Sequence, residues 1–257
     1  MGPSLDTFSP MWWQTSGISI ALTVLVLIAI GFLKPMQRAA STQVLGWILV
    51  AWMIVPPFAH AFAGYWRVEY GLPLQWCDFT GGVAGWALLT RRQALYEIAL
   101  YWGITGAATA LLTPQFTQGT TWFFLTEFFV SHSMLLMAPF FLSVYENMRP
   151  RPWSWLRALG WLNAAALAVG AFDYLVDANY MFLFIAPAGS NPLFQLQWPY
   201  YLIGFEIGCL LLFVLIYLPF RLPRRAPTNP GSSPSVRGAV RMEHSEICLP
   251  ERTNARA

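Results

Sequence analysis

The chain has 257 residues, of which 56% are hydrophobic, 16% aromatic and only 11% charged. Soluble domains carry about 25% charged residues, so this sequence has too little polar surface for a water-soluble fold and predicts a polytopic membrane protein. The net charge of +3 is small and gives no indication of nucleic-acid binding, because the arginines lie at the ends of apolar runs and near the C-terminus. We expect no nucleic-acid partner.

Seven apolar segments approach the roughly 20 residues that a helix needs to cross the hydrocarbon core. In chain order they are 16–34, 44–64, 72–90, 94–113, 122–145, 156–177 and 199–220. The third and fourth are the weakest, since Cys77, Asp78 and Glu97 interrupt them. We therefore expect an all-α fold, with a short extracytoplasmic segment over 1–15 and a bundle of seven transmembrane helices over 16–220.

Basic residues alternate between the connections, which predicts the orientation of the bundle because cytoplasmic loops are enriched in them. After the first, third, fifth and seventh segments come Lys34, Arg38, Arg91, Arg92, Arg149, Arg151, Arg157, Arg221, Arg224 and Arg225. The other loops contain only Arg67. We expect the N-terminus outside and the C-terminus in the cytoplasm, where 221–257, rich in Pro, Ser, Arg and Gly, forms a disordered basic tail.

Polar side chains inside the predicted spans are costly in lipid and indicate functional positions. At about 1.5 Å of rise per residue, most of them lie in the outer half of the membrane: His60, Cys77, Asp78, Glu127, His132, Asp173, Asp177 and Glu206, with Asn179 and Tyr180 just beyond the sixth segment. This clustering predicts a polar, water-accessible cavity that opens outward. We expect Asp173 and Asp177 to form a solvated helix end, and Glu97 and Asn163 to reach water near the inner face.

The small residues of the third segment predict close packing between helices. Gly81 and Gly85 have the GxxxG spacing that lets two helix backbones approach each other. This spacing is common in membrane helices and indicates no particular chemistry.

Cys77 and His132 are the pair with the clearest chemical potential. A membrane cysteine alone usually behaves as a small hydrophobe, but a thiolate is a nucleophile, and a neighbouring histidine can generate it. The two residues lie on different predicted helices in the outer half, so they can meet across the bundle. His132 could equally bond a backbone carbonyl or a serine hydroxyl. Asp78 points about 100° away from Cys77 and is expected to orient a histidine or to hold a headgroup.

Five stretches of the sequence are familiar. They are LPLQWCDFTG, LTRRQALYEIALYWGITGAATALLTP, FFVSHSMLL, WLNAAAL and DANYMFL. Over roughly 15–220, with order and spacing kept, they resemble the YwaF-like family of integral membrane proteins, which is similar to the animal transmembrane protein 164, an acyltransferase that remodels phospholipids. The resemblance implies a multi-pass protein of a bacterial cell membrane, an active centre at Cys77 and His132, and phospholipids or lysophospholipids as substrates.

The first hypothesis is therefore a lipid acyltransferase or lipid ester hydrolase. Cys77, deprotonated by His132, attacks a lipid ester, and a lysolipid or water then takes the acyl group. The supporting residues, which orient His132 or donate hydrogen bonds to the headgroup or the developing oxyanion, are Asp78, Asn179, Tyr180, Glu206 and His60. The sequence has no coenzyme A, nucleotide or metal motif, so no cofactor or metal is expected.

Two alternatives stay open. In a proton- or cation-coupled transporter the ion site would be formed by His60, Asp78, Glu127, His132, Asp173 and Glu206. No internal repeat is visible, which fits inverted-repeat transporters poorly. The other alternative is a non-catalytic lipid-binding scaffold. Only the enzyme is expected to depend on the Cys77 thiol.

Overall fold

The computed structural model of the chain describes residues 8–62, 64, 66–114, 122–187 and 195–222. Within them all regular structure is helical, which confirms the expected all-α class. Residues 223–257 of the predicted tail lie outside the described residues. The described residues belong to one compact unit.

The helices follow one another with short connections. In chain order they are α1 (Pro10–Trp12), the π-helical turn η1 (Trp13–Gly17), α2 (Ile18–Gly31), α3 (Pro35–Phe62), α4 (Trp76–Thr90), α5 (Gln93–Ile98), the π-helical turn η2 (Ala99–Gly103), α6 (Ile104–Leu112), α7 (Trp122–Val144), α8 (Ser154–Val176), the 3₁₀ turn η3 (Tyr180–Phe182) and α9 (Tyr200–Arg221). The first span begins earlier than predicted, because Ser9 caps it and Pro10 occupies its first turn.

Six stretches of helix are long and apolar enough to cross a membrane: Pro10–Gly31, Pro35–Ala59, Gln93–Leu112, Leu125–Val144, Ser154–Val176 and Tyr200–Arg221. The chain is thus a multi-pass membrane protein. The third predicted segment yields only α4, because the stretch 72–75 before it is not helical. With 15 residues, α4 is about 22 Å long, short of the roughly 30 Å of hydrocarbon. Seven spans and the sides of the two termini stay predictions.

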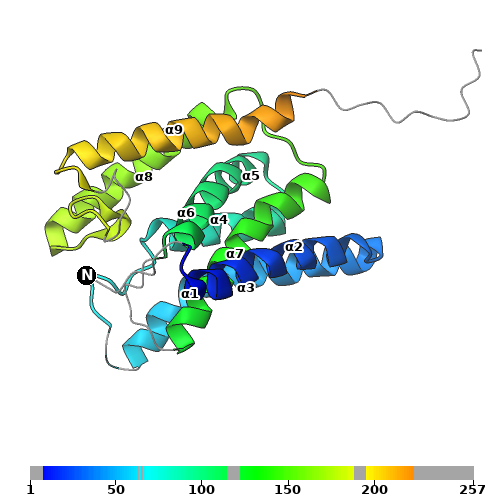
Figure 1. Cartoon of the computed structure of the whole chain (residues 1–257), viewed down its shortest axis with the longest axis horizontal. Coiled ribbons are helices and arrows are strands. Elements are labelled where there is room, and N and C mark those ends of the chain that lie inside the picture. The colour runs from blue at the N-terminus through cyan, green and yellow to red at the C-terminus, as the bar shows by residue number, and fades with distance from the viewer. Residues whose placement is uncertain (1–7, 63, 65, 115–121, 188–194, 223–257) are drawn as a thin grey trace, which may run out of the picture. The chain divides into compact units, whose positions relative to one another are not determined.

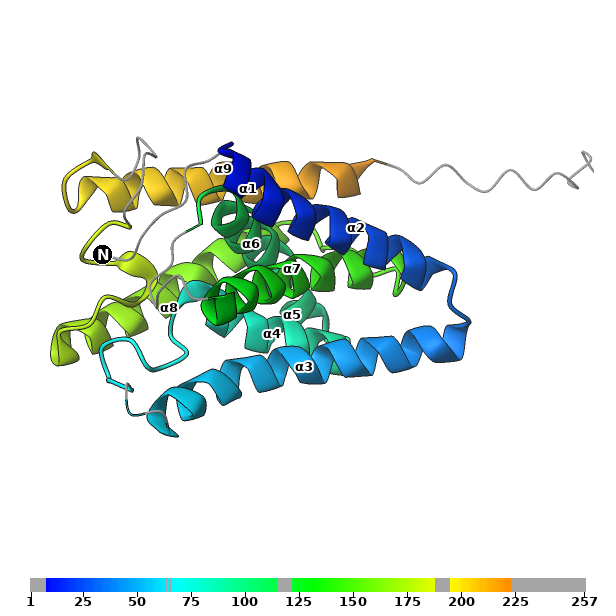
Figure 2. The same ribbon diagram turned by 60° about the horizontal axis from the view of Figure 1, so that its bottom comes forward.

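Helices α4, α5 and α6 lie between α3 and α9 in both views of the ribbon (Figures 1 and 2). Helix α4 packs along α3 and also contacts α7 and η2. At the α3–α4 contact the backbones meet, since a Cβ on Gly85 would lie 2.8 Å from the carbonyl oxygen of Gly46. Gly85 thus meets the GxxxG expectation. Gly81 does not, because a Cβ there would have no atom within 4 Å.

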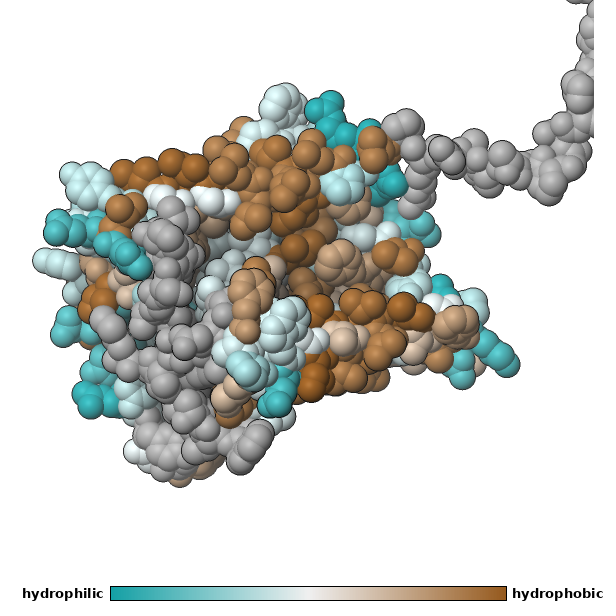
Figure 3. All heavy atoms as spheres, viewed as in Figure 1, coloured by the Kyte–Doolittle hydropathy of each residue, from teal (hydrophilic) through white to brown (hydrophobic). Residues whose placement is uncertain are grey.

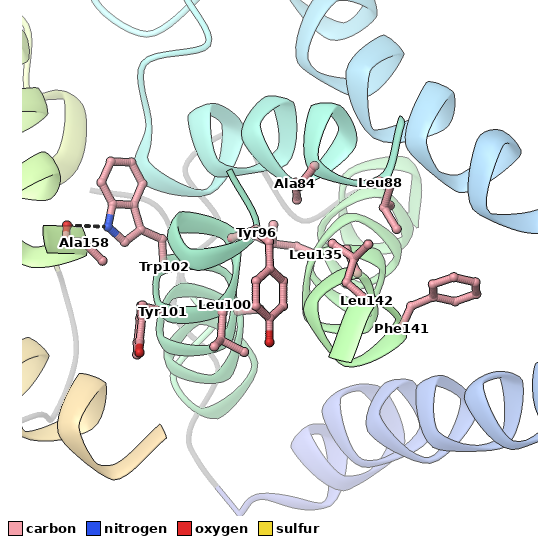
Figure 4. Close-up of a cluster of buried hydrophobic side chains, with 14 of the residues drawn as sticks. Ala84, Leu88, Tyr96, Leu100, Tyr101, Trp102, Leu135, Phe141, Leu142 and Ala158 are labelled. Atoms are coloured by element: carbon pink, nitrogen blue, oxygen red, sulfur yellow. Dashed lines mark hydrogen bonds between the residues drawn. The ribbon is translucent and has the colours of Figure 1, made fainter. Parts of the chain in front are cut away.

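Aromatic side chains fill the centre of the bundle around η2 (Figure 4). Tyr101 and Trp102 are buried, and their polar atoms are bonded across to α8: the Tyr101 hydroxyl lies 2.6 Å from Ser154 Oγ, and Trp102 Nε1 donates to the Ala158 carbonyl at 3.0 Å. Such bonds let large rings be buried without leaving a donor unpaired. They fix α5, η2 and α6 against α8.

Glu97 ties the loop before α8 to α5. Its side chain is 4% exposed and accepts from Arg151 through Nε and NH2, each at 2.9 Å, and from Arg157 NH2 at 3.3 Å. The backbone N–H of Arg151 and the Gln93 amide also donate to it. The expectation that Glu97 reaches water is therefore wrong, because its charge is met by arginines in the protein.

The surface suits a lipid environment. Figure 3 shows hydrophobic side chains along the helices, with hydrophilic side chains gathered toward the helix ends. Large apolar residues are exposed on α2 and α9, among them Leu22, Leu25, Ile203, Leu211 and Leu215. Lipid chains can cover such a surface, whereas monomeric soluble proteins rarely expose apolar patches of this extent.

Candidate functional site

A cavity of about 770 Å³ lies among α4, α6, α7, α8 and α9 and the loop after α8. Most of its lining is apolar. Its ionisable or amide-bearing side chains are Gln75, Cys77, Asp78, Glu127, His132, Asn163, Tyr201 and Glu206. None of the described residues that line it is lysine or arginine. A cavity lined by several of the predicted polar residues is thus present, but most of its lining is apolar, and its carboxylates are those of Asp78, Glu127 and Glu206. Its outward opening stays a prediction.

Cys77 lies in the first turn of α4, with its thiol half-buried. The first intrahelical bond of α4 runs from Phe79 N to Gln75 O at 3.1 Å, so the earlier N–H groups of the turn have no partner within the helix. They and the helix dipole favour negative charge at this end. Gly106 of α6 leaves room beside the thiol, since a Cβ there would lie 3.4 Å from Sγ.

The indole of Trp76 lies beside Gly106 as well, next to the Cys77 sulfur. A Cβ on Gly106 would lie 3.6 Å from Trp76 Nε1, close to its distance from the Cys77 sulfur. The Nε1 atom is buried and has no hydrogen-bond partner within the described residues. Buried donors are normally paired, so this N–H is available to an oxygen bound next to the thiol. In the sequence, nothing marks Trp76 as a donor except its place directly before Cys77.

His132 is held by its own helix. Its Nδ1 lies 2.7 Å from the Phe128 carbonyl oxygen and 3.3 Å from Ser131 Oγ. Because a carbonyl oxygen only accepts, Nδ1 carries the hydrogen, and in the neutral imidazole Nε2 then has a free lone pair. Within the described residues Nε2 makes no hydrogen bond. The imidazole is thus fixed in the tautomer that a general base at Nε2 requires.

Cys77, Asp78 and His132 share one wall of the cavity, since all three also line a smaller space beside it. An active centre at Cys77 and His132 stays a prediction. Asp78 is exposed on this wall and forms no hydrogen bond with another described residue. The orienting contact expected from Asp78 is made by the Phe128 carbonyl instead. Nearby, Glu127 Oε1 accepts from Trp52 Nε1 of α3 at 2.8 Å.

Glu206 lies on another wall, where it pairs with a residue that the sequence placed elsewhere. Asn163 Nδ2 of α8 donates to Glu206 Oε1 of α9 at 2.7 Å, and both line the cavity. Asn163 thus bonds to a side chain of the neighbouring helix, and its place near the inner face stays a prediction. The signal that could have found it is the stretch WLNAAAL, in which it is the one amide.

Asn179 and Tyr180 build the loop beside the cavity and do not line it. Asn179 Oδ1 accepts from Phe184 N and Ile185 N at 3.0 and 3.1 Å. The Tyr180 hydroxyl accepts from Leu72 N at 2.9 Å and donates to the Val68 carbonyl at 2.8 Å. Burial raises the pKa of the Tyr180 phenol, so it keeps the proton that it donates. Their polar groups hold loops together instead of facing a ligand.

A comparison with protein families tests the resemblance that the sequence motifs suggested. The family model described as TMEM164 family matches residues 7–217, which include every residue of the cavity wall described above. The chain belongs to the TMEM164 family. The resemblance drawn from the motifs is thereby confirmed, and the narrower YwaF-like name is compatible with it. No curated protein matches the chain, and no solved structure does.

Two further predicted residues of this TMEM164-family protein, Asp173 and Asp177, do not line the cavity. Asp173 is 1% exposed and lies against Tyr180, so its expected place in a solvated helix end is wrong. Asp177 is exposed and ends α8 in a left-handed conformation. His60 falls within α3, but its side chain lies outside the described residues. Among the described residues, no group of three or more His, Cys, Asp or Glu side chains is arranged to hold a metal ion.

Proposed function

We propose that this TMEM164-family protein transfers acyl chains between membrane lipids through a thioester at Cys77. The observation that carries the proposal is the shared wall: the Cys77 thiol and an imidazole with a free Nε2 face one apolar cavity. The volume of about 770 Å³ lies in the usual range of ligand pockets, roughly 300–1,000 Å³. An acyl chain fits an apolar lining.

In the first half-reaction Nε2 of His132 takes the thiol proton, and the Cys77 thiolate attacks the ester carbonyl carbon of the donor lipid. The tetrahedral intermediate collapses with cleavage of the carbon–oxygen bond. The lysolipid oxygen leaves with the proton from the imidazolium, and the acyl group stays on sulfur as a thioester. Histidine acting in this way commonly contributes about 10²–10⁴ in rate.

In the second half-reaction Nε2 removes the hydroxyl proton of the acceptor lysolipid, whose oxygen attacks the thioester. Cys77 leaves as thiolate and regains its proton from His132. In both halves negative charge develops on the carbonyl oxygen. Two kinds of donor near the sulfur support its stabilisation: the unbonded N–H groups in the first turn of α4 and the buried Nε1–H of Trp76.

The test uses the purified full-length protein in nanodiscs that contain an acyl-labelled phospholipid and an unlabelled lysophospholipid. Mass spectrometry follows label transfer, released fatty acid and the mass of acylated protein. We expect transfer by the wild type, acylation at Cys77 and neither product with Cys77→Ala. Cys209→Ala is the matched control, because Cys209 is buried in α9 and does not line the cavity. Equal turnover in Cys77→Ala would refute the proposal.

A transporter is the second candidate, and one observation favours it. Three carboxylates, of Asp78, Glu127 and Glu206, line the cavity, and no lysine or arginine among the described lining offsets them. Such a site suits a cation or a proton. If the wild type turned over no lipid while Cys77→Ala stayed folded, proteoliposome uptake with Asp78→Asn, Glu127→Gln and Glu206→Gln would be the decisive comparison.

A further inference from the structure

A second, much smaller cavity lies behind the wall that carries the thiol. Its volume is about 30 Å³, and it is enclosed by Leu49, Trp52, Met53, Cys77, Asp78, Gly81, Ser131, His132 and Leu135. Four of these residues, Cys77, Asp78, Ser131 and His132, also line the large cavity. The same side chains therefore separate a lipid-sized space from a small one toward α3.

The small cavity suits water. A cavity needs about 10–15 Å³ of such volume for one water molecule, which typically makes about three hydrogen bonds. Asp78 supplies a carboxylate with no hydrogen bond to another described residue, Ser131 a hydroxyl oxygen, and His132 an imidazole. A glycerol backbone or an acyl chain is too large. One or two waters fit, with acceptors on two helices.

Gly81 shows that the space is open. It is buried and lines only the small cavity of the two, yet a Cβ added to it would meet no atom within 4 Å. The helix contact does not require this glycine, since the close approaches to α3 are made by Gly82, against Met53, and by Gly85, against Gly46. The absent side chain at Gly81 therefore keeps the small cavity free, one turn beyond Cys77.

We infer that the small cavity binds the water that hydrolyses the acyl-Cys77 thioester, so that the protein is a lipid ester hydrolase as well as a transferase. The inference rests on the proposed function. Nε2 of His132 takes one proton of the water, and the oxygen attacks the thioester carbonyl. The carbon–sulfur bond then breaks, a fatty acid is released, and the proton on His132 returns to the Cys77 sulfur.

The substitution Gly81→Ala tests this directly, because it places a methyl group in the space for water without a clash. The full-length protein in nanodiscs is supplied with labelled phospholipid and lysophospholipid in ¹⁸O-enriched water. The readout is the ratio of ¹⁸O-containing fatty acid to transferred acyl chain. We expect Gly81→Ala to lower this ratio about tenfold or more, since positioning a nucleophile is commonly worth orders of magnitude.

Gly160→Ala is the matched control. Gly160 is an exposed residue of α8 whose added Cβ would also meet no atom within 4 Å, so it gives the same gain in helix propensity away from both cavities. Its ratio is expected to equal that of the wild type.

Each other result decides against the inference. An unchanged ratio in a folded Gly81→Ala, or transfer by the wild type without release of fatty acid, overturns the water site and leaves the transferase intact. A fall in the melting temperature of Gly81→Ala overturns it too, because the methyl group would then have met atoms and not open space. A wild type that forms neither product nor acyl-Cys77 overturns the proposed function, and the water site with it.

Discussion

The imidazole Nδ1 of His132 lies 2.7 Å from the carbonyl oxygen of Phe128, one turn earlier in α7. This carbonyl also accepts from Ser131 Oγ at 3.0 Å, and by taking the imidazole hydrogen it assigns the two ring nitrogens to different tasks. Nδ1 holds the ring, and Nε2 is left for the cavity. Orientation of a catalytic histidine is more often the task of a carboxylate, and here a backbone group on the same helix performs it.

The substitution His132→Asn separates the two tasks. The asparagine amide can still donate to the Phe128 carbonyl, so the variant should fold with a melting temperature near that of the wild type. It has no base in place of Nε2, and acyl transfer should fall about 10²–10⁴-fold. Thermal unfolding and the nanodisc assay measure the two effects. A variant that keeps its activity would show that His132 is only structural.

Trp76→Phe should lower the rate of acyl transfer about 10²–10³-fold, the usual loss when one oxyanion donor is removed. The substitution keeps the apolar ring and removes only Nε1–H, which has no partner in the described structure, so stability should not fall. Trp86→Phe is the control, because Trp86 is on the same helix and 49% exposed. Equal rates in the two variants would remove Trp76 from the mechanism.

Tyr180→Phe should act on stability. The hydroxyl joins Leu72 N to the Val68 carbonyl, and its loss leaves these two groups without that partner, at a cost of about 1–3 kcal/mol. Tyr174→Phe, at a position that is 80% exposed, should change nothing. The melting temperature of each variant gives the answer. Lost turnover at an unchanged melting temperature would instead show that Tyr180 supports the reaction, as the sequence suggested.

Glu97→Ala should destabilise the protein by about 1–3 kcal/mol, because it removes the acceptor of the Arg151 backbone N–H and of the Gln93 amide, whereas Arg151 and Arg157 are half exposed and can reach water. Glu146→Ala breaks the more exposed pair with Arg91, at 2.8 Å, and should cost less than about 1 kcal/mol. Unfolding in detergent of graded strength compares the two variants. Similar losses would mean that Glu97 is solvated and its arginines are dispensable.

The sequence predicted the helical class and a cavity in the bundle, and Cys77 and His132 both line the cavity that is observed. Composition and the spacing of polar residues can be read along the chain. Prediction was less reliable wherever the outcome depends on rotation about a helix axis. Asp173 and Asp177 lie four residues apart, yet one is buried and the other exposed. Their depth could be estimated from the rise per residue, but their burial is set by the packing of the loop that contains Tyr180.

Dependence on helix rotation also explains why the contacts of Asn163 and Trp76 were not predicted. Depth alone placed Asn163 near the inner face, whereas its pairing with Glu206 depends on how α8 faces α9. No sequence pattern distinguishes Trp76, and only the approach of Gly106 shows that its N–H lies beside the thiol. A contact between two segments that are far apart in the chain cannot be predicted from the residues of either segment alone.

Glu97 also has a consequence for how the protein is made. Arg151, which binds its carboxylate, follows 54 residues later in the chain, and a ribosome adding about 5–20 residues per second needs roughly 3–10 s to reach it. During that interval α5 holds an acidic side chain with no arginine to meet it. Truncation before residue 151 would make the state permanent, so nascent chains stopped there should be recognised and degraded, whereas chains that include Arg151 and Arg157 should persist.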